Sequence, residues 1–368
     1  MNVHLKNLKK YCGDKMIGIV CAAQMELSPF IKKYTKVFDE MNVPYEIIHW
    51  DRSGEKTDRA DNVHTFTEPL FRYASKIKKL VPFLKFSKYA SKIIKEKKYD
   101  RLVVLTTQTA VLIPNVLLFK YKKKYFFDYR DTSYENISLY RKFVTKIADN
   151  SIGMCFSSPG FREYVKTTAP SVIAHNFQDK HLQGREIECK KSTDGKVRMG
   201  YIGVLREYEY LAGLVEKFGK DSRFEFLIHG GGDDLDKLKK LSENFDNIKV
   251  FGAYKEEEKT DILKSFDMIC YNYPKSFVNY PALANKFYDG MIAKKPMFAN
   301  SATFSGMMVS DNGLGISIDE NDTNITDKIY SYYQNLDAKA FAENCENFLL
   351  KVQEDEKAYH DAIKNIAE

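Results

Sequence analysis

The sequence reads Tyr280-Pro-Ala-Leu-Ala-Asn-Lys-Phe-Tyr-Asp-Gly-Met-Ile-Ala-Lys-Lys-Pro-Met-Phe298 where an amphipathic helical pattern runs directly into a buried strand pattern. Lys286 and Asp289 are three residues apart, so we expect both side chains on one face of the helix, near its N-terminus. There an ammonium group can meet phosphate charge, and a carboxylate can accept hydrogen bonds from ribose hydroxyls. The stretch therefore predicts a grip for a nucleoside diphosphate. The alternative is an ordinary surface helix with one ion pair.

Short apolar runs alternate with helical patterns on both sides of this stretch. This alternation predicts parallel sheets, and 368 residues suit two domains rather than one. We expect the α/β class, with two Rossmann-like domains that face a central cleft. The predicted parts are a first domain over 1–180 with basic helices over 70–98 that break near Pro82, a linker over 181–196, a second domain over 197–350, and a C-terminal helix over 351–368 that can cross back to the first domain.

Charge is unevenly distributed along the chain. Residues 1–195 carry 35 Lys and Arg against 21 Asp and Glu, or +14, whereas residues 196–368 carry 22 against 29, or −7. Much of the basic excess lies between Arg72 and Lys98, where aromatic and aliphatic residues are interleaved with ten basic ones. Such a stretch suits an anionic membrane surface, and the alternative is a solvated helix face. Nucleic acid is disfavoured as a partner because no nucleic-acid-binding motif accompanies the patch.

The six cysteines lie far apart, without the spacing of a zinc site. Reduced thiols are the simplest interpretation, so we expect a cytoplasmic protein. Together with the basic stretch, this predicts a peripheral position at the inner face of the cell membrane.

The opening stretch resembles the Asn/Pro-x-Lys-x-x-Glu-x-x-x-x-Gly-x-Pro pattern of the family 4 (group 1) glycosyltransferases. These enzymes have the GT-B fold and transfer sugars from nucleotide donors. The matching residues are Asn285, Lys286, Phe287, Ala293 and Pro296. The departures are Asp289 for glutamate, Lys294 for glycine, and Pro281 where many members have a second glutamate. The resemblance implies that Lys286 contacts the diphosphate and that Asp289 contacts the ribose.

The resemblance extends through the second domain. Tyr201-Ile-Gly203 resembles the strand that opens this domain in the family, and it implies that Gly203 lets the backbone approach the diphosphate while Arg206 grips it. The alternative for Arg206 is a surface ion pair with a neighbouring glutamate. Further implied donor-binding residues are Gly230 and Gly231 in a glycine turn, and Gly252 and Tyr254 near the base. Tight turns and core packing are the alternatives for these four.

In the first domain, Phe127-Asp-Tyr-Arg-Asp131 ends a predicted strand where related enzymes often have His-Asp. Asp131, or else Asp128, can serve as a base toward an acceptor hydroxyl if the enzyme inverts, with Arg130 beside them. A helix-capping aspartate with a structural arginine is the alternative. No Asp-x-Asp pair suits a metal, and the resemblance implies that no metal or other cofactor is required. Basic side chains and helix dipoles hold the diphosphate in such enzymes.

The sequence thus predicts a glycosyltransferase of the bacterial surface polysaccharide type, acting in capsule or exopolysaccharide synthesis. The expected donor is a nucleotide sugar, uridine-linked, and the expected acceptor is lipid-linked or a polysaccharide at the cytoplasmic membrane face. Two alternatives stay open at this point. One is a nucleotide-sugar 2-epimerase of the same fold, and the other is a catalytically degenerate GT-B partner subunit.

Overall fold

The computed structural model describes residues 15–53, 60–70, 76–176, 189 and 191–368. Residue contacts divide the chain into unit 1, which comprises residues up to 174 together with 355–368, and unit 2, which comprises residues 175–354. Each unit is built on a parallel sheet flanked by helices, so the predicted α/β class with two Rossmann-like domains is confirmed. Most of the predicted linker over 181–196 lies outside the described residues.

Unit 1 contains a parallel sheet with the strand order β3-β2-β1-β4-β5-β6-β7. Its strands are β1 (Ile17–Cys21), β2 (Tyr45–Asp51), β3 (Val63–Thr67), β4 (Arg101–Leu105), β5 (Tyr125–Tyr129), β6 (Gly153–Phe156) and β7 (Ser171–Ile173). Its helices are η2 (Met25–Leu27), α2 (Ile31–Glu40), α3 (Lys76–Lys97), α4 (Thr107–Leu112), η3 (Val116–Lys120), α5 (Ser138–Asp149), η4 (Pro159–Glu163) and the last part of α12 (Ala338–Ala367).

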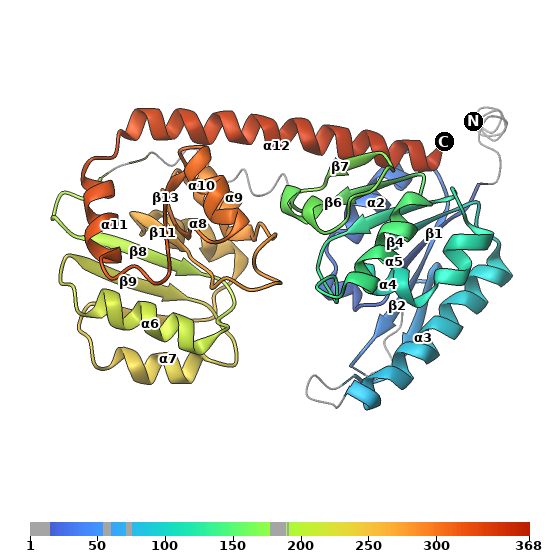
Figure 1. Ribbon diagram of the computed structural model, residues 1–368, viewed down its shortest axis with the longest axis horizontal. Helices are drawn as coiled ribbons and strands as arrows, with labels where there is room; N and C mark the ends of the chain where they lie inside the picture. Colours follow the sequence, from blue (N-terminus) through green and yellow to red (C-terminus); the bar gives the residue numbers. More distant parts are fainter. Residues whose placement is uncertain (1–14, 54–59, 71–75, 177–188, 190) are drawn as a thin grey trace, which may run out of the picture. The chain divides into compact units, whose positions relative to one another are not determined.

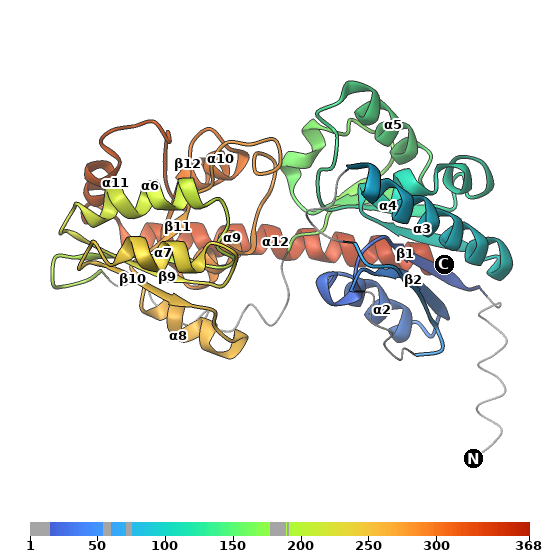
Figure 2. The same cartoon turned by 90° about the horizontal axis from the view of Figure 1, so that it is seen from below.

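Helices cover both faces of the unit 1 sheet (Figure 2). Helix α2 packs on one face, in a core that also takes Tyr359, Ile363 and Ile366 from α12. Helices α3, α4 and α5 lie on the opposite face, where Trp50 stacks on Phe86 with ring centroids 5.6 Å apart. Because both faces are covered, the central strands β1, β4 and β5 consist mostly of buried apolar residues.

Unit 2 contains a second parallel sheet with the strand order β10-β9-β8-β11-β12-β13. Its strands are β8 (Val197–Ile202), β9 (Phe224–His229), β10 (Ile248–Gly252), β11 (Met268–Tyr271), β12 (Met297–Asn300) and β13 (Gly315–Ile318). Its helices are α6 (Tyr208–Gly219), α7 (Leu235–Ser242), η6 (Glu256–Glu258), α8 (Lys259–Lys264), α9 (Asn285–Ile292), α10 (Phe304–Asp311), α11 (Ile325–Gln334) and the first part of α12.

Two hydrophobic cores enclose this second sheet. Helices α6, α7 and α11 bury apolar side chains against one face, and α8, α9, α10 and the start of α12 do so against the other. Figure 1 shows α6 and α7 on the side of the sheet away from α9 and α10. The chain crosses from one face to the other after β10, so the strand order reverses between β8 and β11. Ligands of open α/β sheets bind at the carboxyl ends of the strands at such a point.

Two local features differ from what the sequence predicted. The prediction of a break near Pro82 was wrong, since α3 continues through that residue. The loss of one backbone hydrogen bond at proline does not end the helix, because Phe83 and Phe86, which are three residues apart on the helix, both pack against Trp50. The short edge strand β3 was not predicted.

Within the described ranges, no helix is both long and apolar enough to cross a membrane.

Candidate functional site

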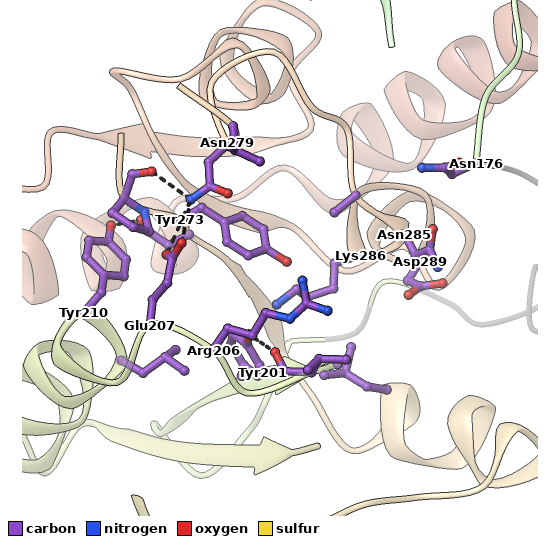
Figure 3. Close-up of a pocket in the computed structure, with 18 of the residues that line it drawn as sticks. Asn176, Tyr201, Arg206, Glu207, Tyr210, Tyr273, Asn279, Asn285, Lys286 and Asp289 are labelled. Carbon is purple, nitrogen blue, oxygen red and sulfur yellow. Dashed lines mark hydrogen bonds between the residues drawn. The ribbon is translucent and has the colours of Figure 1, made fainter. Parts of the chain in front are cut away.

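Unit 2 has a cavity of about 710 Å³ beside the carboxyl ends of β8 and β11 (Figure 3). This is the reversal point of the strand order, where the fold leaves room between diverging loops. Five residues that the sequence assigned to a nucleotide donor line the cavity: Gly203, Arg206, Tyr254, Lys286 and Asp289. The structure therefore brings together residues from three separate segments of the chain, which follow β8, follow β10 and form α9.

Helix α9 places Lys286 in the cavity wall. Leu283, Phe287 and Met291 anchor the helix and the residues before it in the core shared with α12. The residue before the helix, Ala284, donates its backbone N–H to the Tyr271 hydroxyl at 2.9 Å, which ties the start of α9 to the end of β11. Lys286 thus lies in the first turn of a helix whose position is fixed from both sides.

The Lys286 ammonium group is buried without an anionic partner. The residue is only 4% exposed, and its Nζ has no hydrogen-bond partner among the residues that the structure describes. The Nζ lies 3.3 Å from the ring centroid of Tyr201 and 4.7 Å from that of Tyr273, so aromatic faces supply its main contacts. Burial lowers the pKa of Lys286 to about 7, although Cys270 and Asp289 act in the opposite direction. A negatively charged ligand would give this cation the partner that it lacks.

Asp289 lies one turn further along α9 and is 5% exposed. Its Oδ1 is 2.8 Å from the Nζ of Lys259, the first residue of α8. Burial raises the pKa of Asp289, and Lys259 opposes that rise. Lys259 also lines the cavity and was not found from the sequence. Its place in the run Lys255-Glu-Glu-Glu-Lys259 is typical of a solvated helix, and its partner is thirty residues away.

Gly203 is in the cavity wall, whereas Gly230, Gly231 and Gly252 support the loop behind it. Gly203 has a φ of +128°, a conformation that glycine adopts without strain. A Cβ on Gly230 would lie 1.8 Å from the Gly203 carbonyl oxygen, so the close approach of these two loops requires glycine at 230. Gly231 accepts a hydrogen bond from the Leu205 N–H at 2.9 Å, and Gly252 accepts one from the Gly230 N–H at 2.7 Å. Direct donor binding by these three stays a prediction.

The opposite end of the cavity carries polar side chains that sequence reasoning did not assign to the site. Glu207 accepts a hydrogen bond from the Asn279 Nδ2, at 3.1 Å from Oε1. The expected alternative of an ion pair between Arg206 and Glu207 is not seen among the described residues. In Figure 3 Arg206 points toward Lys286, and the Glu207 carboxylate points toward Asn279. The signal for Asn272, which also lines the cavity, is its place directly after β11.

The predicted catalytic residues of unit 1 occupy two different environments. Asp128 and Arg130 are inside the unit, 0% and 6% exposed, with Arg130 Nε 2.9 Å from Asp128 Oδ1. Tyr34 of α2 donates its hydroxyl to Asp128 at 2.7 Å, and the Arg130 guanidinium donates to the Tyr359 hydroxyl of α12 at 3.4 Å. This pair therefore links β5 to two helices, as a structural arginine partner would. Asp131 is exposed at the end of β5. A role in catalysis stays a prediction for all three.

No group of three or more His, Cys, Asp or Glu side chains is arranged to hold a metal ion in the part of the chain that the structure describes. Whether the protein works without a metal stays a prediction.

Comparisons with known proteins identify the fold. No protein-family model matches the sequence. An uncharacterized glycosyltransferase of Methanocaldococcus jannaschii is 22% identical over 244 residues, which are 63% of this chain and 59% of the relative. The chain thus spans 59% of the length of that curated relative.

Solved structures match over nearly the whole chain. Sucrose-phosphate synthase of Thermosynechococcus elongatus is 10% identical with a TM-score of 0.64, over 96% of both chains. The HepE protein of Anabaena, solved in complex with UDP, is 12% identical with a TM-score of 0.63, over 95% of this chain and 100% of that one. The catalytic domain of starch synthase IV from Arabidopsis thaliana, bound to ADP and acarbose, is 12% identical with a TM-score of 0.59, over 96% and 99%. The chain has the GT-B fold. In this GT-B protein, the cavity of unit 2 combines a buried lysine that lacks an anionic partner with a second basic side chain, which is the chemistry of an anion site.

Proposed function

We propose that this GT-B protein is a glycosyltransferase that moves a sugar from a nucleoside diphosphate donor to an acceptor hydroxyl. The observation that carries the proposal is Lys286, a buried cation without an anionic partner, in the wall of a cavity that Arg206 also lines. Burying an unpaired charge is unfavourable, so such a site has a strong preference for an anionic ligand. A diphosphate supplies two or more negative charges at this point.

The same two cations suit the chemical step. Sugar transfer breaks the bond between the anomeric carbon and a diphosphate oxygen, and negative charge then develops on the departing diphosphate. Lys286, which is buried, and Arg206, which is exposed at the cavity wall, would stabilise that charge. The Tyr201 and Tyr273 rings hold Lys286 in place before the ligand arrives, so little reorganisation is needed.

The nucleoside is proposed to lie at the Asp289 end of the cavity. Asp289 accepts hydrogen bonds from ribose hydroxyls, and Lys259 holds its carboxylate in position. Tyr254 lines this end and provides an aromatic wall for the base. We propose that the donor is a uridine nucleotide, in keeping with the resemblance to the family 4 enzymes. The HepE structure, which was solved in complex with UDP, is in line with this choice.

Binding of free nucleotides tests the proposal directly. Thermal unfolding and titration calorimetry with UDP, GDP and ADP should show a raised melting temperature and saturable binding, strongest for UDP. Lys286→Met should weaken binding of the preferred nucleotide by about a hundredfold, because one charge-assisted contact to phosphate is lost. The exposed Lys239 of α7 provides the control Lys239→Met, which should bind like the wild type. Failure of all three nucleotides to bind at millimolar concentration would overturn the proposal.

We further propose that the acceptor is lipid-linked or a polysaccharide at the cytoplasmic face of the cell membrane, in bacterial surface polysaccharide synthesis. Helix α3 supports this finer proposal. Its inward side buries Phe86, Ala90 and Ile94, while Leu80, Val81 and Leu84 are each more than 50% exposed. Lys88, Lys92 and Lys95 are exposed on the next turns of the same helix. Exposed apolar residues beside lysines suit the interface of an anionic membrane.

A further inference from the structure

One end of the unit 2 cavity is not accounted for by a nucleoside diphosphate. The three cavity-lining cations, Lys259, Lys286 and Arg206, are taken up by Asp289 and by the proposed diphosphate. Beyond them the lining side chains are uncharged or acidic, with Glu207, Asn272 and Asn279 as the principal polar groups. A donor that lies with its ribose at Asp289 and its diphosphate at Lys286 would extend its sugar toward this end.

Asn272 offers an unused hydrogen-bond donor there. The residue is 2% exposed, and its Nδ2 has no hydrogen-bond partner among the described residues. Its Oδ1 accepts a hydrogen bond from the Tyr210 hydroxyl, which fixes the orientation of the amide and leaves Nδ2 as the free group. A buried amide without a partner is unfavourable, so a ligand oxygen at this position is the expected partner.

Glu207 offers a fixed hydrogen-bond acceptor. Its φ of +62° places a non-glycine residue in the left-handed region, at the N-terminus of α6. Such a conformation is unfavourable and persists where the surroundings hold it. Asn279 donates to both carboxylate oxygens, at 3.1 Å and 3.4 Å, and its amide also donates to the Pro274 carbonyl at 3.2 Å. The carboxylate is therefore held toward the cavity from the loop before α9.

We propose that Glu207 and Asn272 form the sugar subsite of the donor site and that they select a neutral, hydroxyl-rich glycosyl group over a glycuronosyl group. The inference rests on the proposed function. Glu207 accepts hydrogen bonds from sugar hydroxyls, and the Asn272 Nδ2 donates to a sugar oxygen. The carboxylate comes from the loop between β8 and α6, whereas Pro281 occupies the position at which many family 4 enzymes carry a glutamate.

Charge gives this subsite its selectivity. A glycuronosyl group would bring a second carboxylate beside Glu207, in a region where the lining residues beyond Arg206 include no Lys or Arg among those described. The two like charges repel each other, and because Glu207 is exposed the repulsion should be greatest at low salt. A neutral hexosyl group has only hydroxyls to place there, and these match both the acceptor of Glu207 and the donor of Asn272.

Calorimetry with UDP, UDP-glucose, UDP-galactose and UDP-glucuronate tests the inference on the whole protein, with the corresponding GDP or ADP compounds if one of those nucleotides binds best. The wild type should bind at least one neutral nucleotide sugar about tenfold or more tightly than the glucuronate, as like-charge repulsion predicts. Glu207→Gln keeps the shape of the side chain and should reduce this ratio to about threefold or less. Affinity for the free nucleotide should stay unchanged. Asn272→Ala should weaken binding of the neutral nucleotide sugar and leave binding of the free nucleotide unchanged.

Glu209→Gln is the matched control, since Glu209 is exposed in the first turn of the same helix and does not line the cavity. It should retain the wild-type ratio. An unchanged ratio in Glu207→Gln, or a wild type that prefers the glucuronate, would overturn the inference while nucleotide binding still supports the proposed function. Absence of binding by every free nucleotide would instead overturn the proposed function, and the inference with it. Equal melting temperatures of the variants would show that each is folded.

Discussion

Lys286 is the residue at which stability and binding oppose each other. Its ammonium group is enclosed by aromatic rings and apolar packing, and burial holds its pKa near 7. In the unfolded chain a lysine has a pKa of about 10.4. Burial of this side chain therefore destabilises the native state, a cost that the proposed anionic ligand would offset.

Stability should depend on pH through this residue. Between about pH 7 and pH 10 the unfolded state binds more protons at Lys286 than the native state, so stability rises with pH in that window. Below pH 7 both states are protonated, and the native state bears the full destabilisation, on the order of 4 kcal/mol. Lys286→Met should therefore melt at a higher temperature than the wild type, most of all at pH 6 and hardly at pH 10. Thermal unfolding across this range measures the difference, and a difference independent of pH would contradict it.

Binding should show the opposite dependence on pH. A bound diphosphate favours the charged form of Lys286, so binding takes up a proton when the pH exceeds about 7. Affinity should then fall with rising pH above 7, by up to about tenfold per pH unit, until the pKa of the bound state is reached. The neighbouring Cys270 does not titrate in this range, because burial raises its pKa to about 11. Calorimetry from pH 7 to 9 should show the slope in the wild type and a flat profile in Lys286→Met.

Asp128 and Asp131 are three residues apart and should respond differently to loss of charge. Asp128→Asn leaves Arg130 buried without its carboxylate, which should destabilise the protein by about 3 kcal/mol or more. Asp131→Asn lies at an exposed position and should leave the melting temperature unchanged. If Asp131 is the base of an inverting reaction, this variant should also lose most of its transfer activity. A melting temperature equally lowered in both variants would refute the distinction.

At the scale of elements, α8 and α9 are joined by an ion pair within the proposed donor site. Lys259 at the start of α8 holds the Asp289 carboxylate of α9 at 2.8 Å. Removal of the lysine leaves a buried carboxylate whose pKa burial already raises, so its ability to accept from ribose hydroxyls should fall. If Asp289 binds the ribose as proposed, this ion pair explains how an aspartate can take the place of the longer glutamate in the family 4 pattern.

Lys259→Met should reduce discrimination between ribose and deoxyribose. The wild type should bind UDP more tightly than 2′-deoxy-UDP or 3′-deoxy-UDP, and the variant should narrow that gap by about fivefold or more, since a charge-assisted hydrogen bond is weakened. Lys264→Met on the exposed end of the same helix is the control and should keep the gap. Equal affinities of the wild type for UDP and both deoxy analogues would show that Asp289 does not contact the ribose.

The elements most accessible to sequence reasoning were those with a clear period. The alternation of apolar strands with amphipathic helices predicted both sheets, because the inner strands are largely buried on both faces. The edge strand β3 was missed because its residues Val63–Thr67 are half-buried and mostly polar, so its pattern resembles a loop. Helix α3 was predicted to break because a proline alone does not reveal the aromatic packing that holds the helix together.

The residues of the candidate site also fall into two groups, those that sequence patterns predicted and those that they did not. Lys286 and Arg206 were found because each follows a local pattern, a helix start or a strand end. Lys259, Asn272 and Glu207 were missed because their roles depend on partners 30, 62 and 72 residues away in the sequence. Only folding brings such pairs together, so spacing within one motif cannot reveal them.

At the scale of the whole molecule, the uneven distribution of charge along the chain predicts binding to anionic membranes through α3. Exposed lysines and the apolar residues Leu80, Val81 and Leu84 share α3. The protein should co-sediment with vesicles that contain phosphatidylserine, and binding should weaken between 50 and 300 mM salt, roughly as screening predicts. A variant that combines Leu84→Gln with Lys88→Gln and Lys92→Gln should lose most of this binding.

The matched control for that variant changes two exposed lysines of α7, Lys239 and Lys240, to glutamine. It lowers net charge by two, as the α3 variant does, but leaves α3 intact, so it should still sediment. Equal partition of the wild type to neutral and phosphatidylserine vesicles would argue against membrane docking by α3.

The division of unit 1 along the chain has a consequence for synthesis of the protein. Residues 355–368 complete its core. The rings of Tyr359 and Tyr34 are nearly perpendicular, with centroids 5.8 Å apart, and Ile363 and Ile366 cover the same sheet face. On the ribosome these residues are made after all of unit 2. The N-terminal unit, although translated first, is therefore expected to await the final turns of α12, whereas unit 2 lies within one continuous stretch. A chain that stops just before residue 355 would keep all of unit 2 and yet leave the first-made core open to aggregation.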